Sequence, residues 1–178
     1  ITTMDTWKAF EANELTHSAA HHLLAIHEVG EPYGGWARVS DIARQLNITR
    51  GSVSINLRAL KKRGWVETDE HHLVRLTTTG SKAVRSVMAK RAVLKTFLSD
   101  VLGLPREQAE TDSCKIEHLV SQATAQRLLQ FLRSLTSATP AARDLVEHFR
   151  RFHGKCPRAR TCEVCKGQCL MDELERAI

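Results

Sequence analysis

The chain has 178 residues, 42% of them hydrophobic and only 5% aromatic, so aliphatic side chains must build most of its core. A formal net charge of +6 at pH 7 favours a polyanionic partner. No apolar run approaches the roughly 20 residues that cross a bilayer, and no charged-then-apolar signal segment opens the chain. We therefore expect a cytoplasmic protein without a membrane partner, and a secreted disulfide framework is the less favoured alternative.

The first helix signals lie before a strongly basic segment. Thr16 is a potential N-cap for a helix over residues 17–29, and Gly30 and Pro32 break the chain after it. Ser40 is a potential N-cap for a short helix that ends at the turn 47–49. A second helix is expected from Arg50 or Gly51 to Arg63, where Gly64 stops it. Segments 65–67 and 73–77 alternate like strands around a polar turn, which predicts a β-hairpin.

Segment 38–63 carries seven basic residues against the single acid Asp41, whereas its flanks are acidic. Helix, three-residue turn, helix and hairpin is the order of a winged helix-turn-helix, whose second helix presents its first residues to the major groove of double-stranded DNA. The predicted DNA-binding residues are Thr49, Arg50, Ser52, Ser54, Asn56, Arg58, Lys61, Lys62 and Arg75. A helical hairpin that binds protein, with a solvated basic face, is the alternative.

The second half of the chain is expected to be helical. Apolar residues at helical spacing predict a long helix over 81–102, and Gly103 and Pro105 end it. Two further helices are predicted over 114–135 and 141–152, and a last helical turn or two over 171–178. The fold class is therefore mainly α, with a winged helix-turn-helix domain (1–80), a helical dimerisation and metal-sensing domain (81–152) and a cysteine-rich extension (153–178).

Cys114, Glu117 and His118 are spaced so that, on one continuous helix, they share one face. Thiolate, carboxylate and imidazole together make a mixed site for a divalent transition metal, although a Glu-His pair alone is common on solvated helices. The spacing by itself therefore leaves the metal open.

From about Leu15 to Leu135 the chain resembles the diphtheria toxin repressor and manganese transport regulator family of metal-dependent dimeric repressors. The similarity is carried by segments 42–46, 52–54, 76–80 and 102–104 and by Cys114-Lys115-Ile116-Glu117-His118. It implies that Cys114, Glu117 and His118 are metal ligands, and that His21 on the first helix is a further ligand. Such a mixed ligand set would accept Fe²⁺, Mn²⁺, Co²⁺ or Zn²⁺, and we expect Fe²⁺ or Mn²⁺ at this site. The alternative is that His21 and His22 are surface histidines.

The resemblance also implies what this chain lacks. A second, ancillary metal site of the family maps onto Arg91, Lys95 and Glu110. Two permanently charged cations make poor metal ligands, so we expect that site to be absent and a salt bridge to replace it.

Four of the five cysteines form the pattern Cys-x5-Cys-x2-Cys-x3-Cys, at Cys156, Cys162, Cys165 and Cys169. Four thiolates on one loop favour a soft metal centre, either an iron–sulfur cluster such as 4Fe-4S or a structural Zn²⁺, with reactive free thiols as the third alternative. This loop is not part of the usual family pattern.

The function we expect from the sequence is a non-enzymatic one. It is a homodimeric transcriptional regulator, a repressor of metal or iron homeostasis genes at a DNA operator, which responds to a metal or an iron–sulfur cluster. A redox or electron-transfer protein that uses the four cysteines is one alternative, and a winged-helix regulator of a small organic ligand is another.

Overall fold

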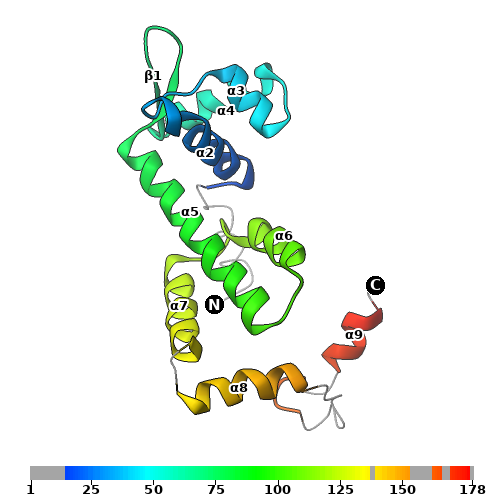
Figure 1. The fold of residues 1–178 in the computed structure, drawn as a ribbon. Coiled ribbons are helices and arrows are strands. Elements are labelled where there is room, and N and C mark those ends of the chain that lie inside the picture. Colours follow the sequence, from blue (N-terminus) through cyan, green and yellow to red (C-terminus); the bar gives the residue numbers. More distant parts are fainter. Residues whose placement is uncertain (1–14, 137–138, 153–161, 166–168, 177–178) are drawn as a thin grey trace. The chain divides into compact units, whose positions relative to one another are not determined.

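The computed structural model describes residues 15–136, 139–152, 162–165 and 169–176 (Figure 1). The chain divides into two compact units between Ser134 and Leu135. The fold class is as expected, because helices dominate and the described residues hold a single two-stranded sheet. None of the described helices is both long enough and apolar enough to cross a membrane.

The first unit begins with the predicted winged helix-turn-helix. Helix α2 (His17–Gly30) is followed by a 3-10 turn (Glu31–Tyr33), α3 (Val39–Leu46) and α4 (Arg50–Lys62). Strands β1 (Val66–Thr68) and β2 (Val74–Leu76) then form the antiparallel wing. The order and the bounds agree with the sequence prediction to within one or two residues at most ends.

Local capping explains why these helices start where they do. The Thr16 hydroxyl accepts a hydrogen bond from the Ala19 amide, and the Thr49 hydroxyl accepts one from the Ser52 amide. Ser40 is not the cap of α3, because that helix already starts at Val39 and Arg38 caps it without a side-chain hydrogen bond. Asn47, at φ 53°, provides the left-handed residue that turns the chain between α3 and α4.

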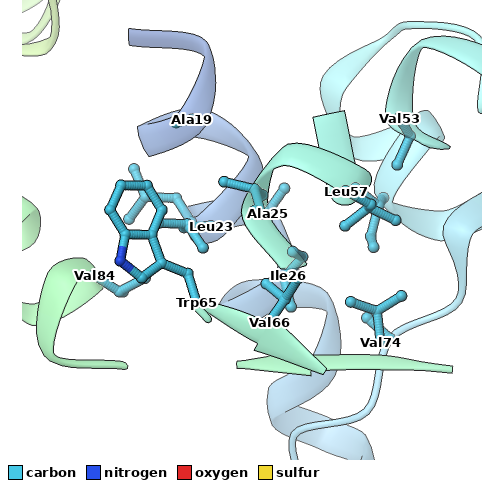
Figure 2. Packing of buried hydrophobic residues seen from close by; sticks show 14 of the residues in the cluster. Ala19, Leu23, Ala25, Ile26, Val53, Leu57, Trp65, Val66, Val74 and Val84 are labelled. Carbon is cyan, nitrogen blue, oxygen red and sulfur yellow. The ribbon is translucent and has the colours of Figure 1, made fainter. Parts of the chain in front are cut away.

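The core of this unit lies where α2, α3, α4 and the wing meet (Figure 2). Leu23, Ile26, Ile42 and Val53 are at most 1% exposed, and Val74 adds the inner face of the wing. Burying each such side chain contributes about 1.5–3 kcal/mol, so the position of α4 is fixed by its apolar side while its other side stays in solvent.

Helix α5 (Thr78–Thr96) leaves the wing and packs against both α2 and α6 (Arg106–Ile116). The Thr77 hydroxyl caps it, and Gly80 is required because a Cβ there would lie 2.0 Å from the Trp65 carbonyl oxygen. The predicted helix over 81–102 is correct in its existence, but its last turn, Phe97–Val101, is a π-helix.

The prediction of one helix over 114–135 is wrong. Helix α6 ends at Ile116, and α7 (Gln122–Thr136) starts only after a turn. The Ser121 hydroxyl accepts a hydrogen bond from the Thr124 amide and so begins a new helix, a local signal that periodicity alone overlooks. Cys114 therefore lies in the last turn of α6, while Glu117 and His118 lie just beyond it.

The second unit contains α8 (Pro140–Arg151) and α9 (Leu170–Arg176). Pro140 is suited to the first turn of α8, where its missing amide costs no hydrogen bond. Both helices fall where the sequence predicted helical structure.

Candidate metal site and nucleic-acid interface

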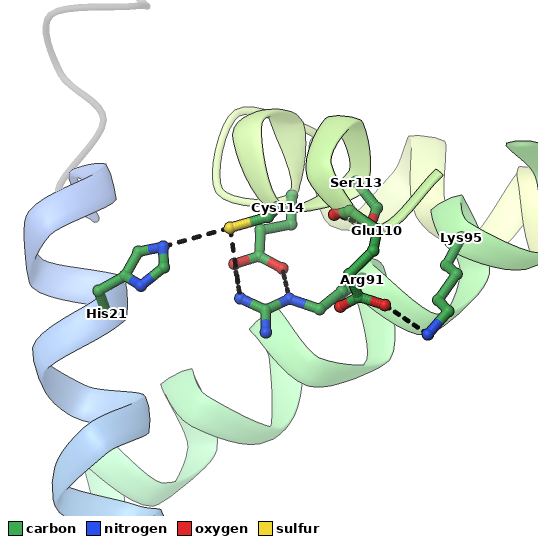
Figure 3. A network of polar contacts seen from close by, with 7 residues as sticks. His21, Arg91, Lys95, Glu110, Ser113 and Cys114 are labelled. Atoms are coloured by element: carbon green, nitrogen blue, oxygen red, sulfur yellow. Dashed lines mark hydrogen bonds and ion pairs between the residues drawn. The ribbon is translucent and has the colours of Figure 1, made fainter. Parts of the chain in front are cut away.

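Three potential metal ligands, two on α2 and one on α6, lie together in the first unit. His17 and His21 are four residues apart on the first turns of α2 and therefore share one face. The His21 Nε2 atom lies 3.3 Å from the Cys114 Sγ atom on α6 (Figure 3). One ligand atom from each of His17, His21 and Cys114 lies within 4.8 Å of the other two. The predicted pairing of His21 with Cys114 is thus present as a side-chain contact.

The protonation of these groups suits a metal site. Burial lowers the pKa of His21, and the neighbouring His17 lowers it further, so the imidazole is neutral at neutral pH and offers a lone pair. Burial raises the pKa of the Cys114 thiol, and the Arg91 guanidinium opposes that rise. A metal ion would therefore have to displace a proton from Cys114 when it binds.

Glu117 has a different partner. Its side chain is fully buried and accepts two hydrogen bonds from Arg91, one from Nε at 2.5 Å and one from Nη2 at 2.8 Å. This bidentate ion pair raises the pKa of Arg91, chiefly through the side-chain hydrogen bond. The Arg91 Nη2 atom also lies 3.8 Å from Cys114 Sγ.

The salt bridge expected at the family's ancillary positions is confirmed for Lys95 and Glu110. Arg91 pairs with Glu117, and Lys95 pairs with Glu110 at a more exposed position. The Lys95 ammonium lowers the pKa of Glu110 through their hydrogen bond. The Arg91–Glu117 pair was not predicted, because the sequence motif assigned Glu117 to the metal.

His118 is half-buried in the turn after α6, and its ring centroid lies 5.1 Å from that of His17. Burial lowers its pKa. His22 is buried rather than on the surface, and its Nδ1 atom hydrogen-bonds the Ser18 carbonyl oxygen at 2.7 Å. His17 was not among the predicted ligands, although its position four residues before His21 was a signal that could have identified it.

The predicted DNA-binding residues lie along α4 and on the wing. Arg50, Ser54, Arg58, Lys61 and Lys62 are exposed. Ser52 is half-buried, and its hydroxyl lies 2.9 Å from that of Thr49 at the helix start. Because the apolar side of α4 is held in the core, these polar and basic groups are all presented on its outer surface.

Two other predicted DNA-binding residues already have protein partners. Asn56 is half-buried, accepts a hydrogen bond from Ser18 on α2 and donates one to the Ser52 carbonyl oxygen. Arg75 pairs with Glu67 across the wing and lies over the Trp36 ring, 4.4 Å from its centroid. Asn56 is therefore well placed to orient α4 against α2, and Arg75 to stiffen the wing.

Three of the four clustered cysteines can be described, and Cys156 lies outside the described residues. Cys162, Cys165 and Cys169 are half-buried and form no disulfide among the described residues. The Cys165 amide donates a hydrogen bond to Cys162 Sγ at 3.4 Å, which orients that sulfur within the Cys-x2-Cys turn.

The fold and these donors define a class of protein: a winged helix followed by a helical segment that shares a metal-ligand cluster with the first helix. The model of the iron dependent repressor metal binding and dimerisation domain matches residues 77–143, and the MarR family model matches residues 14–72. These two matches, with the relatives described next, support the metal-dependent regulator family for this chain.

Individual relatives agree with this assignment. The iron-dependent repressor IdeR of Mycobacterium leprae is 27% identical over 126 residues, which are 71% of this chain and 54% of the relative. The HTH-type transcriptional regulator MntR of Lysinibacillus sphaericus is 29% identical over 99 residues, 56% of this chain and 70% of the relative. The crystal structure of IdeR from T. acidophilum superposes with a TM-score of 0.54 at 28% identity, over 64% of this chain and 53% of that one. The chain thus spans about half the length of the IdeR relatives it matches.

Proposed function

We propose that this protein is a metal-responsive transcriptional regulator that binds double-stranded DNA as a homodimer. One observation carries the proposal: His21, on the helix that packs against α4, contacts Cys114, on a helix of the segment that matches the metal binding and dimerisation domain. A ligand site shared by these two elements couples metal binding to the placement of the helix that reads DNA.

The residues present fit a divalent transition metal. His21 and Cys114 supply a neutral imidazole nitrogen and an ionisable sulfur at ligand spacing, and Glu117 and His118 stay the further ligands predicted from the motif. A bound metal would supply positive charge that holds α2 and α6 together. By analogy with the relatives, the metal in the cell is Fe²⁺ or Mn²⁺, and the genes regulated are those of metal homeostasis, under repression.

DNA recognition is assigned to the outer face of α4. Thr49, Arg50, Ser52, Ser54 and Asn56 lie at its start, where a recognition helix enters the major groove. Arg58, Lys61 and Lys62 follow on exposed positions that suit phosphate contacts, and Arg75 on the wing is an additional candidate.

A second centre is proposed for Cys156, Cys162, Cys165 and Cys169, as an iron–sulfur cluster or, alternatively, Zn²⁺. The Cys165 amide donates a hydrogen bond to Cys162 Sγ, an interaction of the kind that stabilises a metal-bound thiolate. Anaerobic purification followed by an absorption spectrum and iron, sulfide and zinc analysis distinguishes the two. Acid-labile sulfide identifies a cluster, whereas about one zinc per loop identifies a structural site.

The test of the main proposal is DNA binding with and without metal. Operator-like fragments are selected from a random DNA pool in the presence of Fe²⁺ or Mn²⁺, and their affinity is then measured by fluorescence anisotropy. We expect chelation, His21→Ala and Cys114→Ser each to weaken binding at least about fivefold, the lower range of measured allosteric couplings. His27→Ala on the same helix serves as the control. An equal DNA affinity of the metal-free and the metal-loaded protein would contradict the proposal.

A further inference from the structure

Arg91 already satisfies both oxygens of the Glu117 carboxylate. Glu117 is fully buried, so it cannot turn to a metal without leaving the guanidinium, itself half-buried, unpaired in a poorly solvated site. A ligand that has to break a bidentate buried ion pair is a poor ligand. The position that the sequence motif assigns to a carboxylate oxygen is therefore better filled by another group.

His17 is a third potential ligand beside the two remaining donors, His21 and Cys114. Its ring centroid lies 4.3 Å from that of His21, and the ligand atoms of His17, His21 and Cys114 lie within 4.8 Å of one another. In a tetrahedral zinc site, nitrogen and sulfur ligands about 2.0 and 2.3 Å from the metal are roughly 3.5 Å apart. His21 and Cys114 are already at that spacing, and exposed His17 needs only a side-chain adjustment to join them.

We propose that the metal of this site is held by two nitrogens and one sulfur, from His17, His21 and Cys114, and that Arg91 keeps Glu117 out of the ligand set. This inference rests on the proposed function, and it replaces Glu117 by His17 in the ligand set that the motif predicts. Two imidazoles and a thiolate without a carboxylate suit Zn²⁺ and Co²⁺, and they are poorly suited to Mn²⁺, which favours oxygen ligands.

The charges around the site agree with this ligand set. A divalent ion with a Cys114 thiolate and two neutral imidazoles carries one net positive charge, and the Arg91–Glu117 pair beside it carries none. Arg91 also lies 3.8 Å from Cys114 Sγ, where its positive charge favours the thiolate that the metal requires. Arg91 is thus a positioning residue that acts on the site through both Glu117 and Cys114.

The test measures metal binding directly, without DNA. The full-length chain with serine at the four clustered cysteines, positions 156, 162, 165 and 169, removes competing thiolates. Co²⁺ titration reports the sulfur-to-metal charge-transfer band, and X-ray absorption counts nitrogen and sulfur ligands. We expect one sulfur ligand, and His17→Ala should weaken Co²⁺ binding at least about tenfold with loss of one imidazole. His27→Ala, on the same helix but outside the cluster, is the matched control.

Glu117→Gln separates this ligand set from the one that the motif implies. The amide can still accept one hydrogen bond from Arg91, and we expect Co²⁺ affinity within about threefold of the parent protein, a difference below 1 kcal/mol. Sites of either kind bind Co²⁺ more tightly than Mn²⁺, so the order of metal affinities does not distinguish the two ligand sets. The substitutions at the ligand positions distinguish them. Circular dichroism shows whether Glu117→Gln folds. If it does not, the Co²⁺ affinity of His17→Ala and the ligand count of the parent protein test the inference.

Unchanged Co²⁺ affinity in His17→Ala, or an oxygen ligand that disappears in Glu117→Gln, would overturn the inference. Either result leaves the proposed function intact, because a metal would still join α2 to α6. Conversely, a DNA affinity that stays the same when metal is removed would contradict the proposed function, but it would not change the number and type of metal ligands. The two proposals therefore fail in distinguishable ways.

Discussion

At the scale of single residues, the candidate site shows what spacing in a sequence can and cannot establish. The spacing of Cys114, Glu117 and His118 suggested ligands on one helix face, but the helix ends at Ile116 and the three side chains lie in different surroundings. The capture of Glu117 by Arg91, 26 residues earlier, depends on how α5 packs against α6, and no local pattern encodes that. The salt bridge that the sequence did predict, at the ancillary positions, is the Lys95–Glu110 pair.

The Arg91–Glu117 pair gives a prediction about stability. Arg91→Met should lower the free energy of unfolding by about 3–5 kcal/mol, because it leaves the fully buried Glu117 carboxylate without its cation. Urea denaturation of metal-free protein measures the change.

The matched control for that substitution is Lys95→Met, one turn further along α5. Lys95 and Glu110 are each about half-exposed, at 46% and 47%, so their pair is screened by solvent. Its loss should cost less than about 1 kcal/mol. Equal effects of the two substitutions would mean that burial of Glu117 does not set the strength of its ion pair.

At the scale of elements, the winged helix was predictable because each of its helices carries strong local signals. Thr16 and Thr49 cap α2 and α4, Gly64 at φ 69° follows the end of α4, and strand alternation marks the wing. The π-helical last turn of the long helix and the break before α7 were missed, because tertiary packing and a single serine cap determine them. Local sequence signals therefore predict that these elements exist better than they predict where each element ends.

The outer face of α4 gives a prediction about DNA binding. Lys61→Ala combined with Lys62→Ala should weaken binding by a similar factor for selected and unrelated DNA, because exposed lysines near the end of a recognition helix bind phosphates. The slope of log affinity against log salt concentration should become shallower by about 1 for each phosphate that the variant no longer neutralises.

The control for this pair of lysines is Arg106→Ala, which removes an exposed cation at the start of α6, away from α4 in the chain. It should leave the salt slope unchanged. A loss of discrimination between selected and unrelated DNA in the lysine variant, without a change in slope, would contradict the phosphate assignment.

At the scale of the whole molecule, a winged helix presents one recognition helix, so binding to two matched half-sites requires a second copy of the chain. The match to a metal binding and dimerisation domain covers residues 77–143, and helix α7 within it exposes Leu129 and Phe131 at 39% and 44%. Ala125 and Leu132, which share the Leu129 face of α7, are buried, and Phe131 on a different face has an edge-on contact with Phe97. Large apolar side chains that stay partly exposed on such a helix, as Leu129 does, are suited to an interface between subunits.

Leu129→Glu should therefore shift the protein from dimer to monomer, because it places a charge in an apolar contact of two identical surfaces. Analytical ultracentrifugation over a range of concentrations measures the shift. DNA affinity for paired half-sites should fall with it, while affinity for a single half-site should not. Leu145→Glu changes an equally apolar, 53% exposed residue of α8, outside the matched domain, and should leave the dimer intact. The opposite pattern, a dimeric Leu129→Glu and a monomeric Leu145→Glu, would move the interface from α7 to the second unit.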